Sequence, residues 1–448
     1  MIVMKFGGTS VGSAARMKHV ADLVQKYPSP RIVVLSAMSG TTDSLVKIAD
    51  YLKANNTEGA IDVWNQLREK YQNEINQLYA SDLTKKQVWQ SLSEIFDAIR
   101  QYFHWPSITV KEEKFIVAGG ELMSTLMFYH YLNEINHPAT LLPALDFMKI
   151  DENGEPDYTY IREKLNEKLN LHKDIPTYVT QGFICRNPYG DIDNLKRGGS
   201  DYTASIIGSV VQASEVQILT DIDGIHNNDP RYVKNTRPIH YISFDEAAEL
   251  AYFGAKILHP SSVLPAKYAG IPVRLKNTLD PEAFGTIISN QSDHSGHKAV
   301  AAKDGITAIK IKSGRMLLAY GFLRKVFEIF ELYKTPIDVI TTSEVAVSLT
   351  IDDQRYLDEI VADLKKLGTV EVDHDLSIIC IVGNYSEESK GYAAEVFEAL
   401  KEIPIRMISY GGSKYNITVV VKSSHKESAL KLLQQKLFEK NELAGDLK

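Results

Sequence analysis

The sequence predicts an α/β protein in which a mainly parallel sheet covered by helices is followed by two small α+β modules. Short β-rich apolar runs alternate with helical periodicities through the first 290 residues, the pattern of a parallel sheet with helices on both faces. A long helical block interrupts that alternation, and a degenerate internal repeat fills the C-terminal part. Together these observations predict three domains, 1–290, 300–375 and 376–448.

Six apolar runs are the predicted strands of the sheet. They are IVMKF (2–6), RIVVLSA (31–37), TLLPAL (140–145), TYVTQGFI (177–184), VQILT (216–220) and PVRLK (272–276). From Ser44 to Phe103 the pattern is helical instead, with an apolar stripe at 3/4 spacing. Its residues are Val88, Leu92, Ile95, Phe96, Ile99, Tyr102 and Phe103. This stripe indicates a helical subdomain packed on the sheet rather than a ligand site.

The C-terminal part begins with a polar stretch, NQSDHSGHKA (290–299), which is typical of a linker. Beyond it, GFLRKVFEIFELYKTPIDVITTS (321–343) is similar to GYAAEVFEALKEIPIRMISYGGS (391–413). Each copy is followed by alternating apolar residues, so each predicts a helix, a short turn, a strand, a hairpin and a second strand. Two similar modules side by side are therefore expected.

Composition excludes several classes of protein. The 448 residues carry a net charge of −7 with both signs spread along the chain, which argues against nucleic acid as the main partner. No stretch has the roughly 20 apolar residues of a membrane span. The two cysteines, Cys185 and Cys380, are isolated, which favours a reducing compartment. Because the first strand begins at residue 2, no secretory leader is expected, and we predict a cytoplasmic protein.

Two strand ends near the N-terminus are rich in glycine or hydroxyl residues. In MKFGGTS, Lys5 precedes Gly7-Gly8, which fits either a phosphate site or an ordinary tight turn. In LSAMSGTTDSL (35–45), hydroxyl residues surround a glycine and lead into a helix. They suit either helix capping or ligand binding at the carboxyl edge of the sheet. Residue types alone leave both alternatives open.

Two further strand ends carry charged residues. KRGGSDYTASIIGSVV (196–211) places Arg197 before two glycines and Asp201 in the first turn of a helix. This arrangement is either a simple helix start or a site for a small carboxylate. LTDIDGIHNNDPR (219–231) lacks the glutamate of a calcium loop, and Asp221 with Arg231 suits either turns or a nucleotide.

The segment ISFDEAAELAYFGAKILHPSSV (242–263) begins with a capping box, in which Ser243 is the N-cap and Glu246 the N3 residue. Lys256 lies near its far end, either as a helix-end cation or as a second lysine converging with Lys5. His259 has no partner of the kind a metal site or a catalytic triad needs, so we interpret it as structural.

In VAGGELMSTLMF (117–128), Glu121 is predicted at the head of an apolar helix. The candidate residues together describe a pocket with cations, carboxylates, hydroxyls and glycine turns. Such a pocket suits phosphoryl transfer, which needs mainly positioning and positive charge. No arrangement for a covalent nucleophile or a hydrolytic metal competes with that interpretation.

Five motifs in this order resemble the aspartokinases, the enzymes of the amino-acid-kinase fold that phosphorylate the β-carboxylate of L-aspartate. They are KFGGTS (5–10), GELMST (120–125), RGGSDYTA (197–204), TDIDGI (220–225) with DPR (229–231), and FGAKILHP (253–260). The resemblance covers essentially the whole chain. It implies formation of 4-phospho-L-aspartate from ATP, the first step of lysine, threonine and methionine biosynthesis.

The resemblance also implies roles for individual residues. Lys5 and Lys256 would stabilise the γ-phosphoryl group, and Asp201 would hold both lysines. The implied aspartate-binding residues are Ser39, Thr42, Glu121 for the ammonium, Arg197 for a carboxylate, and Ser200. The implied ATP-binding residues are Lys5, Gly7, Gly8, Thr220, Asp221, His226, Arg231, Lys256 and Ile257. The family often has tyrosine at the position of His226. Mg²⁺ would accompany ATP, held through phosphate oxygens and water.

The C-terminal modules resemble the ACT domains of this family, which implies feedback inhibition by lysine, sometimes with threonine. The implied effector residues are Met316, Phe322, Leu323, Asp338, Thr342, Ser343 and Glu344. The strand near IKIKS (309–313) is expected to pair with the second module, so that the two modules interleave. A homodimer through the ACT modules, or a dimer of dimers, is expected, with no homoserine dehydrogenase half.

Two alternatives to aspartate phosphorylation stay open at this point. One is an amino-acid sensor with a vestigial kinase site, which would show no turnover of ATP. The other is a kinase for a different amino acid, which a comparison of aspartate with glutamate would identify.

Overall fold

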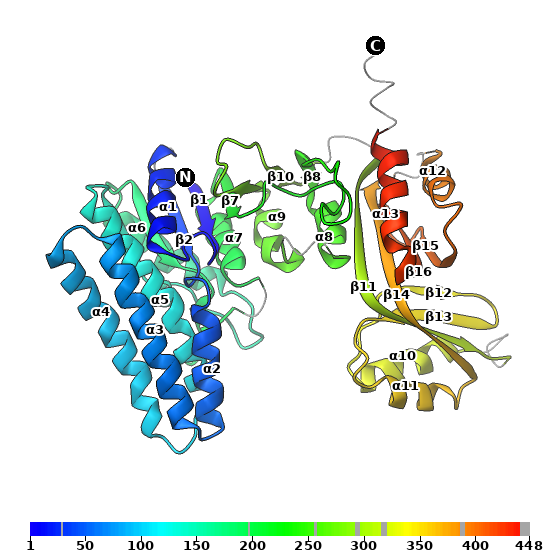
Figure 1. Cartoon of the computed structure of the whole chain (residues 1–448), viewed down its shortest axis with the longest axis horizontal. Coiled ribbons are helices and arrows are strands. Elements are labelled where there is room, and N and C mark those ends of the chain that lie inside the picture. Colours follow the sequence, from blue (N-terminus) through cyan, green and yellow to red (C-terminus); the bar gives the residue numbers. More distant parts are fainter. Residues whose placement is uncertain are drawn as a thin grey trace, which may run out of the picture. The chain divides into compact units, whose positions relative to one another are not determined.

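The structure is a computed structural model that describes residues 1–27, 30–195, 198–254, 258–291, 296–314, 320–385 and 390–439. It has two compact units (Figure 1). Unit 1 comprises Met1–Ile225 and Leu258–Asn290, and unit 2 comprises His226–Ile257 and Gln291–Lys448. The chain thus leaves unit 1 after Ile225 and returns to it at Leu258, so that residues 226–257 belong to the same unit as the C-terminal part.

Unit 1 contains strands that lie side by side in the order β3-β4-β2-β1-β7-β9-β10. All neighbours pair in parallel except β10, which is antiparallel to β9. The strands are β1 (Ile2–Phe6), β2 (Arg31–Leu35), β3 (Ala139–Leu142), β4 (Thr177–Gln181), β7 (Glu215–Thr220), β9 (Val273–Asn277) and β10 (Thr286–Ser289). Each of the six predicted runs contributes a strand, which confirms the prediction of a parallel α/β sheet.

Three of the predicted strands are shorter than expected. The run 31–37 ends at Leu35, and the run 140–145 ends at Leu142, just before a proline that has no N–H for the ladder. The run 177–184 is broken at Gly182-Phe183. A Cβ on Gly182 would lie 2.4 Å from the side chain of Ser200, and Phe183 has φ +67°. The chain then continues into a hairpin of β5 (Ile184–Arg186) and β6 (Ile192–Asn194).

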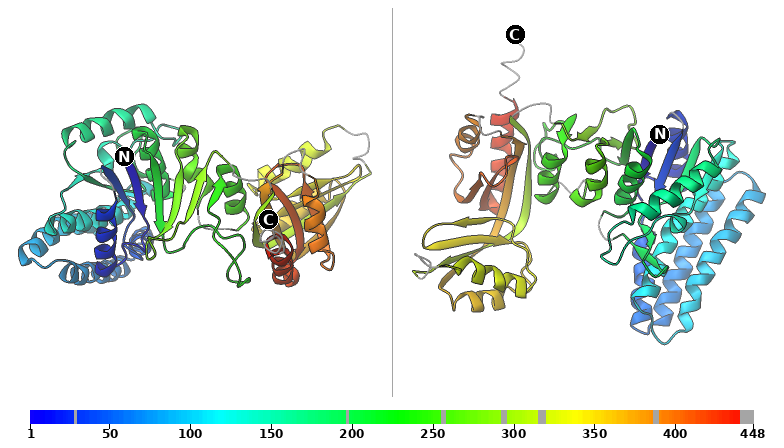
Figure 2. Two further views of the ribbon diagram at one scale, coloured as in Figure 1. Left: turned by 90° about the horizontal axis from the view of Figure 1, so that it is seen from above. Right: turned by 180° about the vertical axis from the view of Figure 1, so that it is seen from behind.

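Helices flank the sheet of unit 1 (Figure 2). They are α1 (Ala14–Lys26), α2 (Thr41–Lys53), α3 (Thr57–Leu78), α4 (Asp82–Arg100), α5 (Val110–Glu134), α6 (Tyr158–Leu171), α7 (Gly199–Val211) and α9 (Leu264–Ala269). Short 3-10 turns are formed by Gln101–His104, Ala144–Asp146 and Pro260–Val263. Helix α7 packs against β1, β2 and β7, and α5 packs against β2, β3 and β4.

The long helices α2, α3, α4 and α5 run side by side as a bundle (Figures 1 and 2). The predicted apolar stripe lies inside it, with Val88, Leu92, Phe96 and Ile99 fully buried. Aromatic rings lock the stripe to α3, since Trp64 meets Phe96 edge-on at 5.9 Å between ring centroids. The interpretation of this block as a packed helical subdomain is confirmed.

Unit 2 is built around a six-stranded sheet in the order β12-β13-β11-β14-β16-β15. Its strands are β11 (Gly296–Lys312), β12 (Ile340–Thr342), β13 (Ala346–Ile351), β14 (Thr369–Asn384), β15 (Ile405–Tyr410) and β16 (Asn416–Lys422). The other elements are β8 (Tyr241–Ser243), α8 (Phe244–Tyr252), α10 (Phe322–Leu332), α11 (Leu357–Leu364), α12 (Tyr392–Ala399), α13 (Lys426–Gln434), a 3-10 turn (Ser423–His425) and a π-helical turn (Gln435–Glu439).

The internal repeat appears as two equivalent sets of elements, α10-β12-β13 and α12-β15-β16. Two long central strands serve both sets. The second half of β11, from Ile306 on, pairs with the first half of β14, and the first half of β11 pairs with the second half of β14. Ile309 and Ile311 accordingly belong to the core under α10, whereas Val300 belongs to the core under α12. The two modules therefore share strands and interleave. The expected pairing of the strand near IKIKS (309–313) with the second module is wrong, because this part of β11 pairs with β13 and belongs to the core under α10. The first half of β11 pairs instead with the half of β14 that lies beside β16.

The predicted linker over 290–299 is wrong at its C-terminal end. Strand β11 begins at Gly296, and His297 and Ala299 pair with β14. The polar composition was misleading because a strand pairs through backbone groups, which polar residues and glycine also provide. Residues 292–295 lie outside the described part of the chain.

Candidate active site

The carboxyl ends of four parallel strands meet at one edge of the unit 1 sheet. Phe6 at the end of β1 is level with Leu35 of β2 and with Leu219 of β7, and Leu35 is level with Gln181 of β4. The segments that follow these strands therefore start next to one another. In open α/β sheets this edge is where ligands bind.

An ion pair occupies this edge. Lys5 Nζ lies 2.6 Å from Asp201 Oδ1, and the two side chains are only 13% and 16% exposed. Asp201 belongs to the first turn of α7, which follows Gly198 in the left-handed conformation, φ +67°. A Cβ on Gly198 would come 2.3 Å from Ser262, so glycine is required there. The predicted association of Lys5 with Asp201 is thus present in the structure.

The glycines after β1 let two turns approach each other closely. The N–H of Ser39 donates to the carbonyl oxygen of Gly8 at 3.2 Å. A Cβ on Gly8 would lie 2.8 Å from the carbonyl oxygen of Ala37, closer than real Cβ contacts come. Gly7 is looser, since its Cβ would lie 3.6 Å from Lys5 Nζ. Close packing therefore requires glycine at position 8 whether or not a phosphate binds there.

Glu121 is buried in the same region, but the prediction that it heads a helix is wrong. Helix α5 begins at Val110 behind a capping box of Thr109 and Glu112, so Glu121 lies in its middle. The side chain is buried, with the residue 4% exposed. A Cβ on Gly120 would lie 2.8 Å from that of Ala37, and a Cβ on Gly119 would lie 3.1 Å from Ile99 of α4. The two glycines therefore allow α5 to pack closely against the segment after β2 and against α4, and they do not start a helix.

The two carboxylate oxygens of Glu121 differ in their surroundings. Oε1 accepts a hydrogen bond from the N–H of Ala37 at 3.2 Å. Oε2 is buried and has no hydrogen-bond partner among the described residues. Burial raises the pKa of Glu121 to about 7, against the opposing effect of the Ala37 N–H. A ligand ammonium would satisfy Oε2 and restore the charge of the carboxylate.

Hydroxyl groups join α7 to the segment after β2. Ser36 Oγ donates to Ser200 Oγ at 2.9 Å, and Ser124 Oγ donates to the carbonyl oxygen of Ser36 at 2.9 Å. Ser39 is exposed, and its carbonyl oxygen accepts from Lys70 Nζ at 2.5 Å. Thr42, the second residue of α2, is half-buried. Ser36 is one of the hydroxyl residues of LSAMSGTTDSL, but only Ser39 and Thr42 of that stretch were predicted as site residues, and Ser124 was not selected.

The predicted nucleotide residues fall in both units. Thr220 ends β7 in unit 1, and its Oγ1 donates to Asp221 Oδ1 at 3.0 Å. His226 and Arg231 belong to unit 2. There His226 Nδ1 contacts Thr236 Oγ1 at 2.9 Å, and Arg231 forms a fork with the carboxylate of Asp229, with Nη2 at 2.7 Å.

Several predicted residues lie outside the described part of the chain. They are Arg197, Lys256, Ile257 and Met316. Neighbouring predictions are confirmed: the capping box of Ser243 and Glu246 starts α8, and His259 has the structural role expected, since its Nδ1 accepts from the N–H of Ser261 at 3.2 Å. Among the described residues, no group of three or more His, Cys, Asp or Glu side chains could hold a metal ion.

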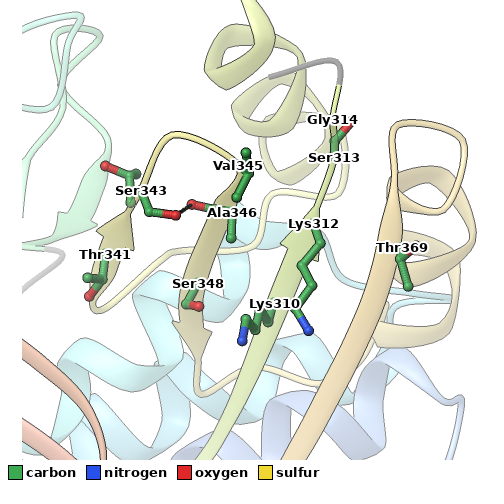
Figure 3. Close-up of a pocket in the computed structure, with 11 residues that line it drawn as sticks. Lys310, Lys312, Ser313, Gly314, Thr341, Ser343, Val345, Ala346, Ser348 and Thr369 are labelled. Atoms are coloured by element: carbon green, nitrogen blue, oxygen red, sulfur yellow. Dashed lines mark hydrogen bonds between the residues drawn. The ribbon is translucent and has the colours of Figure 1, made fainter. Parts of the chain in front are cut away.

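The predicted effector residues that the structure describes do not all line one pocket of unit 2. Phe322 and Leu323 begin α10, where Phe322 is buried in the core of the module. Thr342 and Ser343 line a pocket of 610 Å³ beside Lys310 and Lys312 (Figure 3). Phe322, Leu323, Asp338 and Glu344 are not among the residues that line this pocket. Asp338 lies elsewhere in the unit, with a side chain that is 1% exposed.

Fold and site together define a class of protein. A parallel sheet whose carboxyl edge carries a lysine–aspartate pair, a glycine turn and a helix N-terminus is an arrangement that handles phosphoryl groups. The model of the amino acid kinase family matches residues 1–277, and that of the ACT domain matches residues 379–437. The chain belongs to the amino acid kinase family. Family membership implies ATP as the phosphoryl donor.

Within that family the chain is an aspartokinase. Aspartokinase 1, chloroplastic, of Arabidopsis thaliana is 35% identical over 467 residues, covering 99% of this chain and 81% of the relative. Lysine-sensitive aspartokinase 3 of Escherichia coli (strain K12) is 34% identical over 451 residues, covering 98% and 99%. The crystal structure of E. coli aspartokinase III in complex with lysine and aspartate, in the T-state, matches with a TM-score of 0.84 at 33% identity and covers 98% of this chain and 99% of its own.

Proposed function

We propose that this aspartokinase transfers the γ-phosphoryl group of ATP to the β-carboxylate of L-aspartate. A β-carboxylate oxygen attacks the γ-phosphorus, the bond to the β,γ-bridging oxygen breaks, and 4-phospho-L-aspartate and ADP leave. No proton has to move, so the residues act by positioning and by positive charge. The single observation that supports this proposal best is the Lys5–Asp201 pair at the carboxyl edge of the sheet, 2.6 Å apart.

Lys5 is placed to stabilise the charge on the transferring phosphoryl group. Asp201 holds the ammonium from the first turn of α7, and burial of both side chains strengthens the interaction. In the proposed site Lys256 supplies a second cation. Gly7, Gly8, Thr220, Asp221, His226, Arg231 and Ile257 complete the proposed nucleotide contacts. Mg²⁺ would be held mainly by phosphate oxygens and water, which suits its preference for retaining water ligands.

Aspartate binding is proposed at Glu121, Arg197, Ser39, Thr42 and Ser200. Glu121 Oε2, which has no hydrogen-bond partner among the described residues, supports the ammonium end of this assignment, because such a buried carboxylate oxygen is costly until a cation pairs with it. Ser200 is already tied to Ser36 at 2.9 Å, which fixes its hydroxyl beside the start of α7.

The test is a coupled assay of ADP release with ATP, Mg²⁺ and aspartate, combined with trapping of the acyl phosphate by hydroxylamine as a hydroxamate. We expect hydroxamate to form in proportion to ADP, with aspartate preferred over glutamate. ADP without hydroxamate would mean ATP hydrolysis, and a preference for glutamate would overturn the substrate. Both results contradict the proposal.

Regulation is proposed at the C-terminal modules, with lysine, alone or with threonine, as the feedback effector. The lysine bound in the structure of the E. coli relative supports lysine as the first effector to test. We also propose assembly as a homodimer through the ACT modules, or as a dimer of dimers. The proposed functional domains are 1–290, 300–375 and 376–448, with the last two interleaved through β11 and β14. Dose–response curves with lysine, threonine and both test the effector, and flat curves would contradict it.

We propose the cytoplasm as the working compartment. Both cysteines are buried free thiols, as a reducing compartment allows. None of the helices in the described ranges is long and apolar enough to cross a bilayer. Fractionation of cells that express the tagged chain would check this assignment.

A further inference from the structure

Helix α8 is attached to the unit 2 sheet at two points of one face. Glu249 accepts from Ser413 Oγ at 2.8 Å and from Asn416 Nδ2 at 2.7 Å, which ties the helix to the second module. Tyr252, three residues later and on the same face, donates its hydroxyl to Asp338 Oδ1 at 3.2 Å in the first module. This one helix is therefore hydrogen-bonded to both modules.

Asp338 is an unusual partner for a tyrosine because it is almost completely buried. Its side chain is 1% exposed, and its backbone N–H donates to the carbonyl oxygen of Thr350 at 2.9 Å, which fixes its position. Oδ1 accepts hydrogen bonds from the Tyr252 hydroxyl and from the Lys303 ammonium. Oδ2 is buried and has no hydrogen-bond partner among the described residues. Burial raises the pKa of Asp338, and the Lys303 ammonium acts in the opposite direction.

Lys303 is shared between two carboxylates. Its Nζ lies 2.7 Å from Asp338 Oδ1 and 2.8 Å from Asp352 Oδ2, and the Asp352 side chain is 40% exposed. The same ammonium lies over the ring of Tyr252, 5.0 Å from its centroid. Lys303 also stands where β11 changes register against β14, between Lys303 and Ile306. The ammonium can thus leave Asp338 and keep an ionic partner in Asp352.

We propose that Lys303 is a built-in occupant of the Asp338 carboxylate, which the ammonium of the feedback amino acid must displace, and that Tyr252 transmits this exchange to α8. The proposal rests on the proposed feedback function of unit 2. A free amino acid and a lysine side chain present the same group to Asp338, so they compete for it. Displacement moves the cation off both Asp338 and the Tyr252 ring, which changes what holds the end of α8.

The chain around α8 is built to respond to such a change. Gly254, two residues after Tyr252, has φ +124°, and a Cβ there would lie 2.1 Å from the carbonyl oxygen of Ala302. Ala302 is the residue before Lys303, so the end of α8 rests against the backbone that carries the displaced cation. Beyond Gly254 the chain continues to Lys256, which lies outside the described residues and has the proposed catalytic role.

The first test measures equilibrium binding of lysine to the full-length protein by calorimetry. Lys303→Met removes the internal competitor, and we expect the Kd for lysine to fall by about tenfold, the worth of one hydrogen bond to a charged group. Lys303→Arg keeps the cation and should leave the Kd within about threefold. Lys366→Met is the control, because this lysine pairs with Asp363 on the surface of the first module at 2.6 Å and is not among the residues that line the pocket of Thr342 and Ser343.

A variant that leaves Asp338 unpaired could fail to fold, so Lys303→Gln, which still donates a hydrogen bond, is measured beside it. Thermal melting shows which variants are folded. A Kd for lysine that is unchanged or weaker in the folded Lys303→Met or Lys303→Gln protein would overturn the proposal.

The second test separates binding from transmission. Tyr252→Phe keeps the ring but removes the hydroxyl that reaches Asp338. We expect lysine to bind with a Kd within about threefold of wild type. The logarithm of the ratio between the uninhibited and the fully inhibited rate should fall by at least about half, because the hydrogen bond that couples Asp338 to α8 is lost. An unchanged inhibition ratio would overturn the role of Tyr252.

The outcomes distinguish this inference from the proposed function beneath it. If the wild type neither binds nor responds to lysine or threonine, the feedback proposal and this inference both fail, while aspartate phosphorylation is judged by its own assay. If the wild type is inhibited but the Lys303 and Tyr252 variants behave like it, only this inference fails.

Discussion

Two buried carboxylates, one in each unit, have opposite surroundings. Glu121 is 4% exposed, has one oxygen on a backbone N–H and forms no ion pair among the described residues, and burial raises its pKa to about 7. The side chain of Asp338 is 1% exposed, but Lys303 lies 2.7 Å from it. The first site lacks its counter-ion and therefore suits a ligand cation. The second already holds an internal one, so a ligand there must compete.

The largest expected effect concerns the positive charge of Lys5, which we propose stabilises the transferring phosphoryl group. Lys5→Ala should lower kcat by at least about 100-fold, because removing one group that stabilises transition-state charge typically costs that much. The measurement is steady-state kinetics of ADP release. Lys53→Ala, which breaks a pair with Glu113 on the outside of the bundle at 2.8 Å, is the control and should leave kcat unchanged. A kcat for Lys5→Ala within threefold of wild type would remove Lys5 from the mechanism.

The next effect concerns the carboxylate without a counter-ion. Glu121→Gln keeps the shape and an acceptor for the Ala37 N–H, but it cannot pair with an ammonium. We expect the KM for aspartate to rise by about 10- to 100-fold, the worth of a hydrogen bond to a charged group, with the KM for ATP unchanged. Glu113→Gln on the same helix is the matched control. If both KM values rose together, Glu121 would be holding the fold of the site rather than the aspartate.

The same residue should give stability a pH dependence. An acid whose pKa rises from an ordinary 4.5 to about 7 on folding binds its proton more tightly in the folded state. The free energy of unfolding of the wild type therefore falls as the pH rises from 4.5 to about 7. The loss is up to about 3 kcal/mol, since each unit of pKa difference corresponds to about 1.36 kcal/mol. The Tm of Glu121→Gln minus the Tm of wild type should therefore increase over this pH range and stay constant above it. A difference independent of pH would mean that Glu121 keeps an ordinary pKa.

The smallest expected effect distinguishes Asp338 from the pocket that Thr342 and Ser343 line. Lys312 lines that pocket, but its side chain is 47% exposed and pairs only with Glu371 among the ion pairs of the described residues. Solvent screens such a pair, so Lys312→Met should change neither Tm nor the inhibitory concentration of lysine by more than the experimental error. A large loss of inhibition in this variant would place the effector in the pocket (Figure 3) and not at Asp338.

The sequence predicted the parts of this molecule that periodicity determines. The strands of the parallel sheet, the buried stripe around Phe96 and the capping box at Ser243 are all present, because each follows from local spacing. The ends of strands were predicted less well, since Pro143 and the close approach of Gly182 to Ser200 act through the ladder and through a distant helix. The linker over 290–299 was misassigned for a similar reason, because strand pairing does not require apolar residues.

Site prediction had a comparable limit. The Lys5–Asp201 pair was expected from resemblance and is present at 2.6 Å. Glu121 was assigned to the start of a helix, and its burial in the middle of α5 could not be foreseen from residue types. Lys303 contacts three residues that are far from it in the sequence, Tyr252, Asp338 and Asp352. No local sequence pattern could therefore predict these contacts.

The way in which the halves of β11 and β14 pair has a consequence for how the two modules evolve. Because the first part of β11 completes the second module and the last part completes the first, neither module can be deleted or transplanted alone without leaving an unpaired strand half. A gene fusion that carries the two modules to another enzyme must therefore move residues 296–439 as a single cassette. Recombination within that stretch would be eliminated by misfolding, so the pair should evolve as one unit.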